Sequence, residues 1–509
     1  MEQYLCYDLK GIQQYIFQVP KLTCCIGGSR QIDGFDHQAL DAESSEEVQR
    51  IYSGGGKGAF LCKNDAALSS LKQELIGKAL AKGLTIRFGI DADYLCAARE
   101  IRETYCYQPD SLEGQPCPLS GLYPTTDKEH AHPLIEAREK QGRQHGKESP
   151  TEAKFLEILK KEFGEDFSFF YNVDPSDFRG RENTPSGAEG AAALGNRNRW
   201  AVICMDGNDM GLQFLEFQKK QPRIEEWQKW LPEMSKNLDK CTREAATAGM
   251  IAVTREYLKE EESSRVLPIR PLIVGGDDVT ILISCKYAIL FAQTVMNAFN
   301  EASKKCKELW VGTRGEMTIS AGVLYAPVSL PLHSALGYAE MLLASAKTHG
   351  RELKKLSGSA CSPACLDWES VTEGLLLSPA ARREKEFKFT DPETKNEVEL
   401  TARPYSMEEF KSLLDIKKAV EKIPNTILYQ LHPGLLTAKE NRMAFYARLC
   451  KNHPSLVKRL MEPLPEKNGC GEWWEFERNI QRTKVIDAVL LLQEEMRMEQ
   501  ETILNEEED

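Results

Sequence analysis

Two adjacent aspartates, Asp277 and Asp278, follow two glycines in the stretch RPLIVGGDDVTILIS, residues 270–284, with apolar runs on both sides. Gly275 and Gly276 allow a tight turn, so the aspartates are expected at the tip of a hairpin, clear of the sheet. Two neighbouring carboxylates repel each other and need a cationic partner. Hard divalent cations take carboxylate oxygens, so the pair predicts a site for Mg²⁺ or Mn²⁺.

A third carboxylate, Asp206, ends the apolar stretch WAVICMD at 200–206. If that strand pairs beside the hairpin, three carboxylates can hold two metals about 4 Å apart, an arrangement that serves phosphoryl transfer. Asp209 either joins the ligands or caps the following helix. The alternative is a solvated turn without chemistry, because Gly and Asp are common turn residues.

Strands and amphipathic helices alternate in two parts of the chain. The first part is expected to contain strands at 3–9, 58–63 and 84–90 and a helix at 65–82. The second is expected to contain strands at 200–206 and 316–326, a hairpin with arms PLIV and VTILIS, and helices at 224–260, 286–308 and 333–356. These two parts are therefore compact α+β units that could position the carboxylates.

The two units resemble each other in sequence. YLCYDLKG corresponds to VICMDGNDMG, YSGGGKGAFLC to IVGGDDVTILI, and LTIRFGID to MTISAGVLY. This repetition predicts a duplicated domain in which the first copy has GGGK, ending at Lys57, where the second has GGDD. Two unrelated hairpins would be the alternative.

The rest of the chain differs in composition. Residues 105–199 are polar and irregular apart from a helix at 151–163, and after about 365 the pattern is charged and helical up to the acidic end NEEED. We therefore divide the chain into a first domain at 1–104, a linker at 105–199, a second domain at 200–360 and a helical C-terminal domain at 361–509.

The amino-acid composition and net charge exclude several classes of protein. The 509 residues are 41% hydrophobic and 28% charged, which is typical of a globular protein. The net charge of −12 argues against nonspecific nucleic-acid binding over the whole surface. No apolar run approaches the roughly 20 residues of a membrane span, and the start lacks a secretory signal. Fifteen cysteines without a repeating spacing suit reduced thiols, so we expect a cytoplasmic protein without membrane contact.

Several motifs resemble the paired palm domains of the large polymerase subunit of type III CRISPR complexes, over roughly 1–100 and 200–355. They are YDLKGIQQYIF and IGGSR in the first copy, and DGNDMG, VGGDDV, SAGV and AEMLLASAK in the second. The resemblance implies two ferredoxin-like palms, related to nucleotide cyclases and GGDEF diguanylate cyclases. It also implies conversion of ATP into a cyclic oligoadenylate messenger when target RNA is bound.

The resemblance also implies roles for residues. Asp206, Asp277 and Asp278 would be the catalytic metal ligands. Lys347, followed by Arg351, would contact the nucleotide triphosphate, and Gly275 and Gly276 of the turn would also line the nucleotide site. The glycine-rich first copy would hold a second nucleotide across a pseudo-twofold interface. Its candidate residues are Gly28 and Ser29 of IGGSR and Lys57 of GGGK.

Departures from the family pattern limit these expectations. No adjacent His-Asp pair of the kind an HD nuclease uses occurs, so we expect a member without that domain. Asn208 stands where a further acidic ligand is expected. Cys106 and Cys117 lie where the family often has a zinc ribbon, with His130 and His132 nearby, but no C-x-x-C accompanies them. We therefore expect less than one equivalent of zinc.

Three functions remain open at this stage. The first is a nucleotidyltransferase or cyclase that uses ATP in antiviral defence, within a CRISPR complex or alone. The second is a noncatalytic scaffold whose helical C-terminal region binds CRISPR subunits or guide RNA. The third is a GTP-using dinucleotide cyclase. The sequence does not select the base, the ring size of the product or the oligomeric state.

Overall fold

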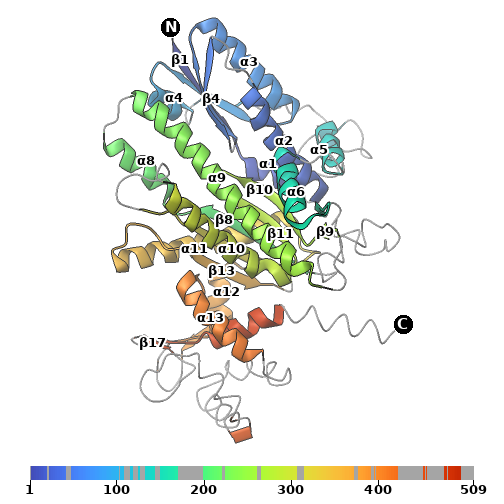
Figure 1. The fold of residues 1–509 in the computed structure, drawn as a ribbon, viewed down its shortest axis with the longest axis vertical. Helices are drawn as coiled ribbons and strands as arrows, with labels where there is room; N and C mark the ends of the chain where they lie inside the picture. Colours follow the sequence, from blue (N-terminus) through green and yellow to red (C-terminus); the bar gives the residue numbers. More distant parts are fainter. Residues whose placement is uncertain are drawn as a thin grey trace, which may run out of the picture.

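The computed structural model describes residues 2–169, 199–306 and 315–421 apart from short gaps, a few residues near 452, and most of 475–494. The first palm lies at one end of the long axis, the second palm in the middle and the C-terminal region at the other end (Figure 1). Among the described residues, no helix has the length and apolar character to cross a membrane.

The first palm is a four-stranded antiparallel sheet in the order β2-β3-β1-β4, with helices between its strands. Its elements are β1 (Gln3–Leu9), α1 (Ile12–Phe17), α2 (Leu22–Asp41), β2 (Val48–Gly54), β3 (Lys57–Cys62), α3 (Asp65–Ala81), β4 (Ile86–Asp91) and α4 (Tyr94–Glu100). The strands and the helix expected here are confirmed.

The second palm contains a six-stranded sheet in the order β10-β11-β8-β12-β13-β16. Its elements are β8 (Arg199–Gly207), α8 (Met210–Lys219), α9 (Ile224–Tyr257), β10 (Ile269–Gly275), β11 (Asp278–Ile283), the short helix η2 (Cys285–Tyr287), α10 (Ala288–Lys305), β12 (Ile319–Pro327) and α11 (Leu332–Ser357). The elements expected here are confirmed as well. The two remaining strands of the sheet, β13 (Cys365–Ser370) and β16 (Tyr405–Ser406), come from the C-terminal region.

The two palms are copies of one topology. The order β2-β3-β1-β4 corresponds strand for strand to β10-β11-β8-β12. Asp8 pairs with Lys57 in the first sheet, as Asp206 pairs with Asp278 in the second. Each hairpin also has a register shift three residues before its tip, at Ile51 and at Leu272. The predicted duplication is therefore confirmed at the level of individual residues.

Strand β8 explains the direction in which the catalytic candidates point. Its alternate residues Ala201, Ile203 and Met205 pack into a core with α9 and α10. The intervening residues, from Trp200 to Cys204, pack with the first palm and with α11. Because successive strand residues face opposite sides of a sheet, Asp206 faces α11 and the first palm. The carboxylates of β8 and β11 are thereby directed to the junction of the palms.

The described residues between the palms include secondary structure beyond the one helix expected there. They contain the short strands β5 (Gln115–Pro116), β6 (Pro124–Thr125) and β7 (Ser168–Phe169), which pairs with β9 (Val266–Leu267), and the helices α5 (Pro133–Arg143) and α6 (Pro150–Phe163). Helix α6 was expected, and it begins with a capping box in which Ser149 and Glu152 bond each other's backbone amides. Helix α5 was not expected, since its buried face is formed partly by Arg138, whose guanidinium stacks on the ring of Tyr15.

The C-terminal region contains helices, as expected, and also strands that the sequence pattern did not predict. Its helices are α12 (Pro379–Glu386), α13 (Met407–Val420) and a segment at 485–494. A small sheet has the order β14 (Lys388–Thr390), β15 (Glu397–Glu399), β18 (Ile480–Arg482) and β17 (Glu475–Glu477). A buried ionic network of Arg403 with Glu369 and Asp487 joins β13, a strand of the second-palm sheet, to later parts of the C-terminal region.

Candidate active site

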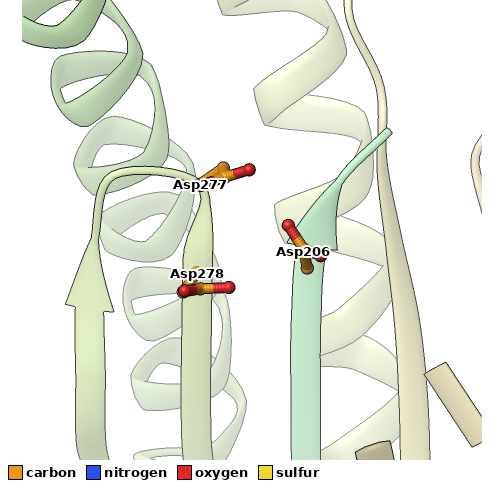
Figure 2. A group of neighbouring side chains, drawn as sticks. All are labelled: Asp206, Asp277 and Asp278. Carbon is orange, nitrogen blue, oxygen red and sulfur yellow. The ribbon is translucent and has the colours of Figure 1, made fainter. Parts of the chain in front are cut away.

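Three aspartates meet at the end of the β10–β11 hairpin. One carboxylate oxygen from each of Asp206, Asp277 and Asp278 lies within 4.8 Å of the others. Figure 2 shows Asp277 at the hairpin tip, Asp278 at the start of the returning strand and Asp206 on the neighbouring strand. Among the described residues, this is the only group of three or more potential metal-ligating side chains. The donor set, all carboxylate oxygens, suits a hard divalent cation.

Two glycines make this arrangement sterically possible. Gly276 has φ +61°, a backbone conformation that favours glycine. A Cβ atom at Gly207 would lie 3.0 Å from the Cβ of Asp277, so a larger residue there would push the tip away from β8. The dipeptide Asp206–Gly207 therefore contributes both a carboxylate and the space that Asp277 occupies.

The proximity of the carboxylates changes their acidity. Burial and the negative charge of Asp206 raise the pKa of Asp277 to about 7. The same two causes raise the pKa of Asp278 to about 6, against the opposing influence of Lys347 and Lys57. The Asp278 side chain is exposed to solvent, which screens this interaction, so burial contributes less to its pKa shift than to that of Asp277. The cluster is thus short of positive charge, as expected for a site that binds a cation.

Two lysines from different palms approach the cluster. Lys347 of α11 donates hydrogen bonds to the Asp206 carboxylate and, at 2.8 Å, to the carbonyl of Gly207. Lys57 is exposed at the start of β3 and close enough to lower the pKa of Asp278. The positive charge at the tip of the first palm therefore acts on a carboxylate of the second. Arg351 is exposed one helical turn beyond Lys347.

Asp209 lies outside the cluster. Its carboxylate accepts hydrogen bonds from Lys354 at 2.7 Å and from the backbone amide of Ser362 at 3.0 Å. Although burial opposes the change, these bonds lower its pKa. It occupies the N-cap position of α8, but its side chain does not cap that helix. The structure thus brings together three of the four acidic residues considered from the sequence.

The Asn208 side chain makes structural hydrogen bonds and lies outside the group of potential metal ligands. Its amide donates to Thr318 at 2.8 Å, and its side-chain oxygen accepts from Ser320 at 3.0 Å. The side chain is buried and joins the end of β8 to β12. An amide serves this purpose better than a carboxylate, because it can both donate and accept.

The equivalent position in the first palm is occupied by an ion pair that sequence reasoning missed. Asp8 accepts a hydrogen bond from Arg87 of β4 at 2.9 Å. The residue that corresponds to Arg87 in the second palm is Ser320, since each is the β4 or β12 partner of the strand-end aspartate. The sequence signal for this ion pair was therefore present in LTIRFGI, because Arg87 stands where the second copy has the small residue Ser320. In the first copy, the charge of Asp8 is therefore balanced by Arg87 of the same sheet.

Gly28 and Ser29 lie in packed contacts of helix α2. A Cβ at Gly28 would lie 3.4 Å from the Cα of Ile16, which makes this glycine part of the α1–α2 contact. The Ser29 hydroxyl donates to the carbonyl of Leu272, so it connects the first palm to β10 of the second. A nucleotide contact for either residue stays a prediction.

The cysteines considered for zinc lie in separate surroundings. Cys117 is buried in a small apolar cluster with Val19, Cys24 and Ile135. Its sulfur accepts a hydrogen bond from the backbone amide of His132. Cys106 lies next to Tyr107, which forms a bridge to Ile86 of β4. His130 is outside the described residues.

The acidity of the cluster predicts a pH-dependent stability of the metal-free protein. The folded state binds a proton at Asp277 more tightly than the unfolded chain, where an aspartate pKa is about 3.9. Stability should therefore fall as the pH rises from about 4 to about 7. Asp277→Asn should be more stable than the parent at pH 8 by about 1–2 kcal/mol after allowance for solvent screening, and by less than half of that at pH 5, where only the unfolded chain has lost its proton.

Denaturant unfolding at pH 5 and pH 8, without divalent cations, measures this difference. Added Mg²⁺ at pH 8 should stabilise the parent more than the variant. A variant that is equally or less stable than the parent at both pH values would contradict the proposed charge repulsion.

Comparison with known proteins identifies the class to which this fold and site correspond. The duplicated sheets and the acidic cluster define a protein with paired palm domains. Residues 199–354 match the family model for the Cas10/Cmr2 second palm domain. The chain therefore resembles the large polymerase subunit of type III CRISPR complexes. No curated protein sequence matches the chain.

Solved structures share the fold over nearly the whole chain. Crystal structures of a Csm1-Csm4 cassette with cA4 and with cA3 align with TM-scores of 0.52 and 0.51, each at 13% identity. Both alignments cover 97% of this chain, and they cover 70% and 69% of the respective matched chains. A cassette structure with pppApA aligns with a TM-score of 0.50 at 13% identity, covering 96% of this chain and 69% of the other. The likeness supports an α+β architecture of two palms with a further C-terminal region.

Proposed function

We propose that this chain is a nucleotidyltransferase that converts ATP into a cyclic oligoadenylate-type signalling product in antiviral defence. The observation that carries the proposal is the acidic cluster of Asp206, Asp277 and Asp278 at the junction of two palms. The similarity to Csm1 chains, whose cassette has been crystallised with cA4 and cA3, supports the choice of product class.

Asp206, Asp277 and Asp278 are the residues that would hold Mg²⁺ or Mn²⁺. When bound, such ions activate an attacking hydroxyl and stabilise the leaving oxygens in phosphoryl transfer. The clustered negative charge of the protein supports this role, since the raised pKa values of Asp277 and Asp278 reflect carboxylates without sufficient counter-charge. Asp209 is already engaged by Lys354, so we propose it as a neighbour that fixes the end of β8.

The proposed reaction joins the ribose 3′-oxygen of one nucleotide to the α-phosphorus of another. The bond between the α-phosphorus and the bridging oxygen to the β-phosphate breaks, pyrophosphate leaves, and the hydroxyl proton passes to solvent. Lys347 and Arg351 supply positive charge on the second-palm side of the site, and Lys57 supplies it from the first palm. This division suits two nucleotides held between the palms.

Product analysis tests the proposal. The purified chain is incubated with each nucleoside triphosphate and Mg²⁺ or Mn²⁺, with and without guide and target RNA and the matching CRISPR subunits. We expect pyrophosphate release and a cyclic adenylate product from ATP. If only GTP gives a product, the substrate is GTP and the proposed use of ATP is wrong. No pyrophosphate under any of these conditions would support a noncatalytic scaffold instead.

Replacing Lys57 with alanine is expected to raise the KM for ATP about fivefold to tenfold and to change kcat by less than about twofold. A charge that positions the second nucleotide acts in the ground state and the transition state alike. Steady-state kinetics at varied ATP measures the two constants. Lys63→Ala, an exposed lysine just beyond the other end of β3, is the matched control. A fall in kcat without a change in KM would contradict a positioning role.

A further inference from the structure

Helix α9 holds both backbone polar groups of Gly276, the residue before the two catalytic aspartates. The Asp239 carboxylate accepts a hydrogen bond from the Gly276 amide at 3.3 Å. The Thr242 hydroxyl donates to the Gly276 carbonyl at 2.6 Å. Thr242 is fully buried. Since a short glycine-rich turn has little side-chain packing of its own, these bonds restrict its conformation.

The same helix is connected to the first palm through the segment between the palms. Arg243 donates to Asp239 at 2.7 Å and to the Thr151 hydroxyl at 2.6 Å. The Thr151 hydroxyl in turn donates to Asp33 of helix α2 at 3.1 Å. A continuous hydrogen-bonded chain thus runs from α2 through α6 and α9 to the catalytic turn.

The first palm repeats the contact between its long helix and its hairpin tip. Asp36 of α2 accepts a hydrogen bond from the Gly56 amide at 2.9 Å. Asp36 lies one helical turn after Asp33, and α2 occupies the place in the first palm that α9 has in the second. Each tip is therefore held by an aspartate from the equivalent helix. The hydrogen bonds of Thr151 join these two helices.

Buried ion pairs fix the position of Thr151. Its neighbour Glu152 forms ion pairs with Arg30 of α2 at 2.9 Å and with Arg270 at the beginning of β10. All three side chains are at least nine-tenths buried. Because breaking a buried ion pair is costly, the start of α6 is held firmly between the palms.

We propose that Asp239, Thr242 and Arg243 are positioning residues for the catalytic turn, and that Thr151 makes this positioning depend on the contact between the palms. The effect on turnover rests on the proposed nucleotidyltransferase function. The effect on the conformation of the turn is independent of that function. A change in the relative position of the palms would act on Asp277 and Asp278 through this chain without touching a nucleotide.

Thr151→Val tests the proposal, because valine keeps the shape of threonine and removes the hydroxyl. Amide hydrogen exchange of the peptide covering 270–284 is expected to become about fivefold to tenfold faster in the metal-free protein. Mn²⁺ affinity, measured by calorimetry, is expected to weaken about threefold to tenfold. If the chain is active, kcat should fall by a similar factor with little change in the KM for ATP.

Thr242→Val is expected to show the larger effect, and Thr242→Ser should restore parent behaviour because it keeps the donor. Arg255→Gln is the matched control, since the exposed pair Arg255–Glu162 also joins α9 to α6 but lies away from the turn. Thermal unfolding confirms that each variant is folded. Unchanged exchange and Mn²⁺ affinity in both Thr151→Val and Thr242→Val would overturn the inference. Absence of product from the parent would overturn the proposed function alone, since exchange and metal binding still decide the positioning role.

Discussion

Simultaneous replacement of Asp277 and Asp278 by asparagine is expected to lower product formation at least about 1,000-fold and to leave the protein folded. Both carboxylates belong to the group that would bind the metal ions, and asparagine is a weaker ligand for a hard cation. Burial and the neighbouring negative charge of Asp206 raise the pKa of both carboxyls, so the charged state is disfavoured at each position. Removing the charges should therefore not destabilise the hairpin.

Pyrophosphate release at saturating ATP measures the loss, and circular dichroism with thermal unfolding checks the fold. Glu165 and Asp166 offer a matched control, because they are an adjacent acidic pair located away from the site. Their replacement by glutamine and asparagine should leave turnover unchanged. Retained turnover in the Asp277–Asp278 double variant would falsify the two-metal assignment. Unfolding of that variant would instead indicate a structural role for the turn.

The sequence was sufficient to predict the elements that carry the acidic cluster. Strands such as β8 are continuous apolar runs, and a strand end followed by Asp-Gly is visible directly. The pairing of β8 with β11 entered the sequence analysis only as a condition, and the structure supplies it. The meeting of Asp206 with Asp278 follows from that pairing, since the two residues are register partners.

Other features depend on contacts that local patterns do not encode. Helix α2 contains Gly27, which reads as a loop signal, yet a Cβ there would clash with the backbone of α5. The glycine is thus required by tertiary packing. The support of the turn by Asp239 and Thr242 joins residues more than 30 positions apart, and no residue type in α9 indicates it. Such contacts become visible only when the helix is placed against the hairpin.

Alanine at Asp206 is expected to abolish turnover, with a loss of at least about 1,000-fold at saturating ATP, whereas alanine at Asp8 should not. The two residues occupy equivalent strand ends, but their partners differ. Asp206 lies among carboxylates and Lys347, so its removal takes a ligand from the proposed metal site. Asp8 is paired with Arg87, so its removal leaves a partly buried guanidinium without its carboxylate.

The expected result for Asp8→Ala is therefore a loss of about 1–3 kcal/mol in stability, with kcat within about threefold of the parent. Arg87→Ser, which introduces the residue found at the equivalent position of the second palm, separates the ion pair from any chemistry of Asp8. It should lower stability similarly and leave kcat unchanged. Kinetics of Asp206→Ala, Asp8→Ala and Arg87→Ser, with unfolding curves for each, decide between the alternatives. Equal losses of turnover at Asp8 and Asp206 would mean that both copies take part in the chemistry, which would contradict the proposal of a metal site in the second palm alone.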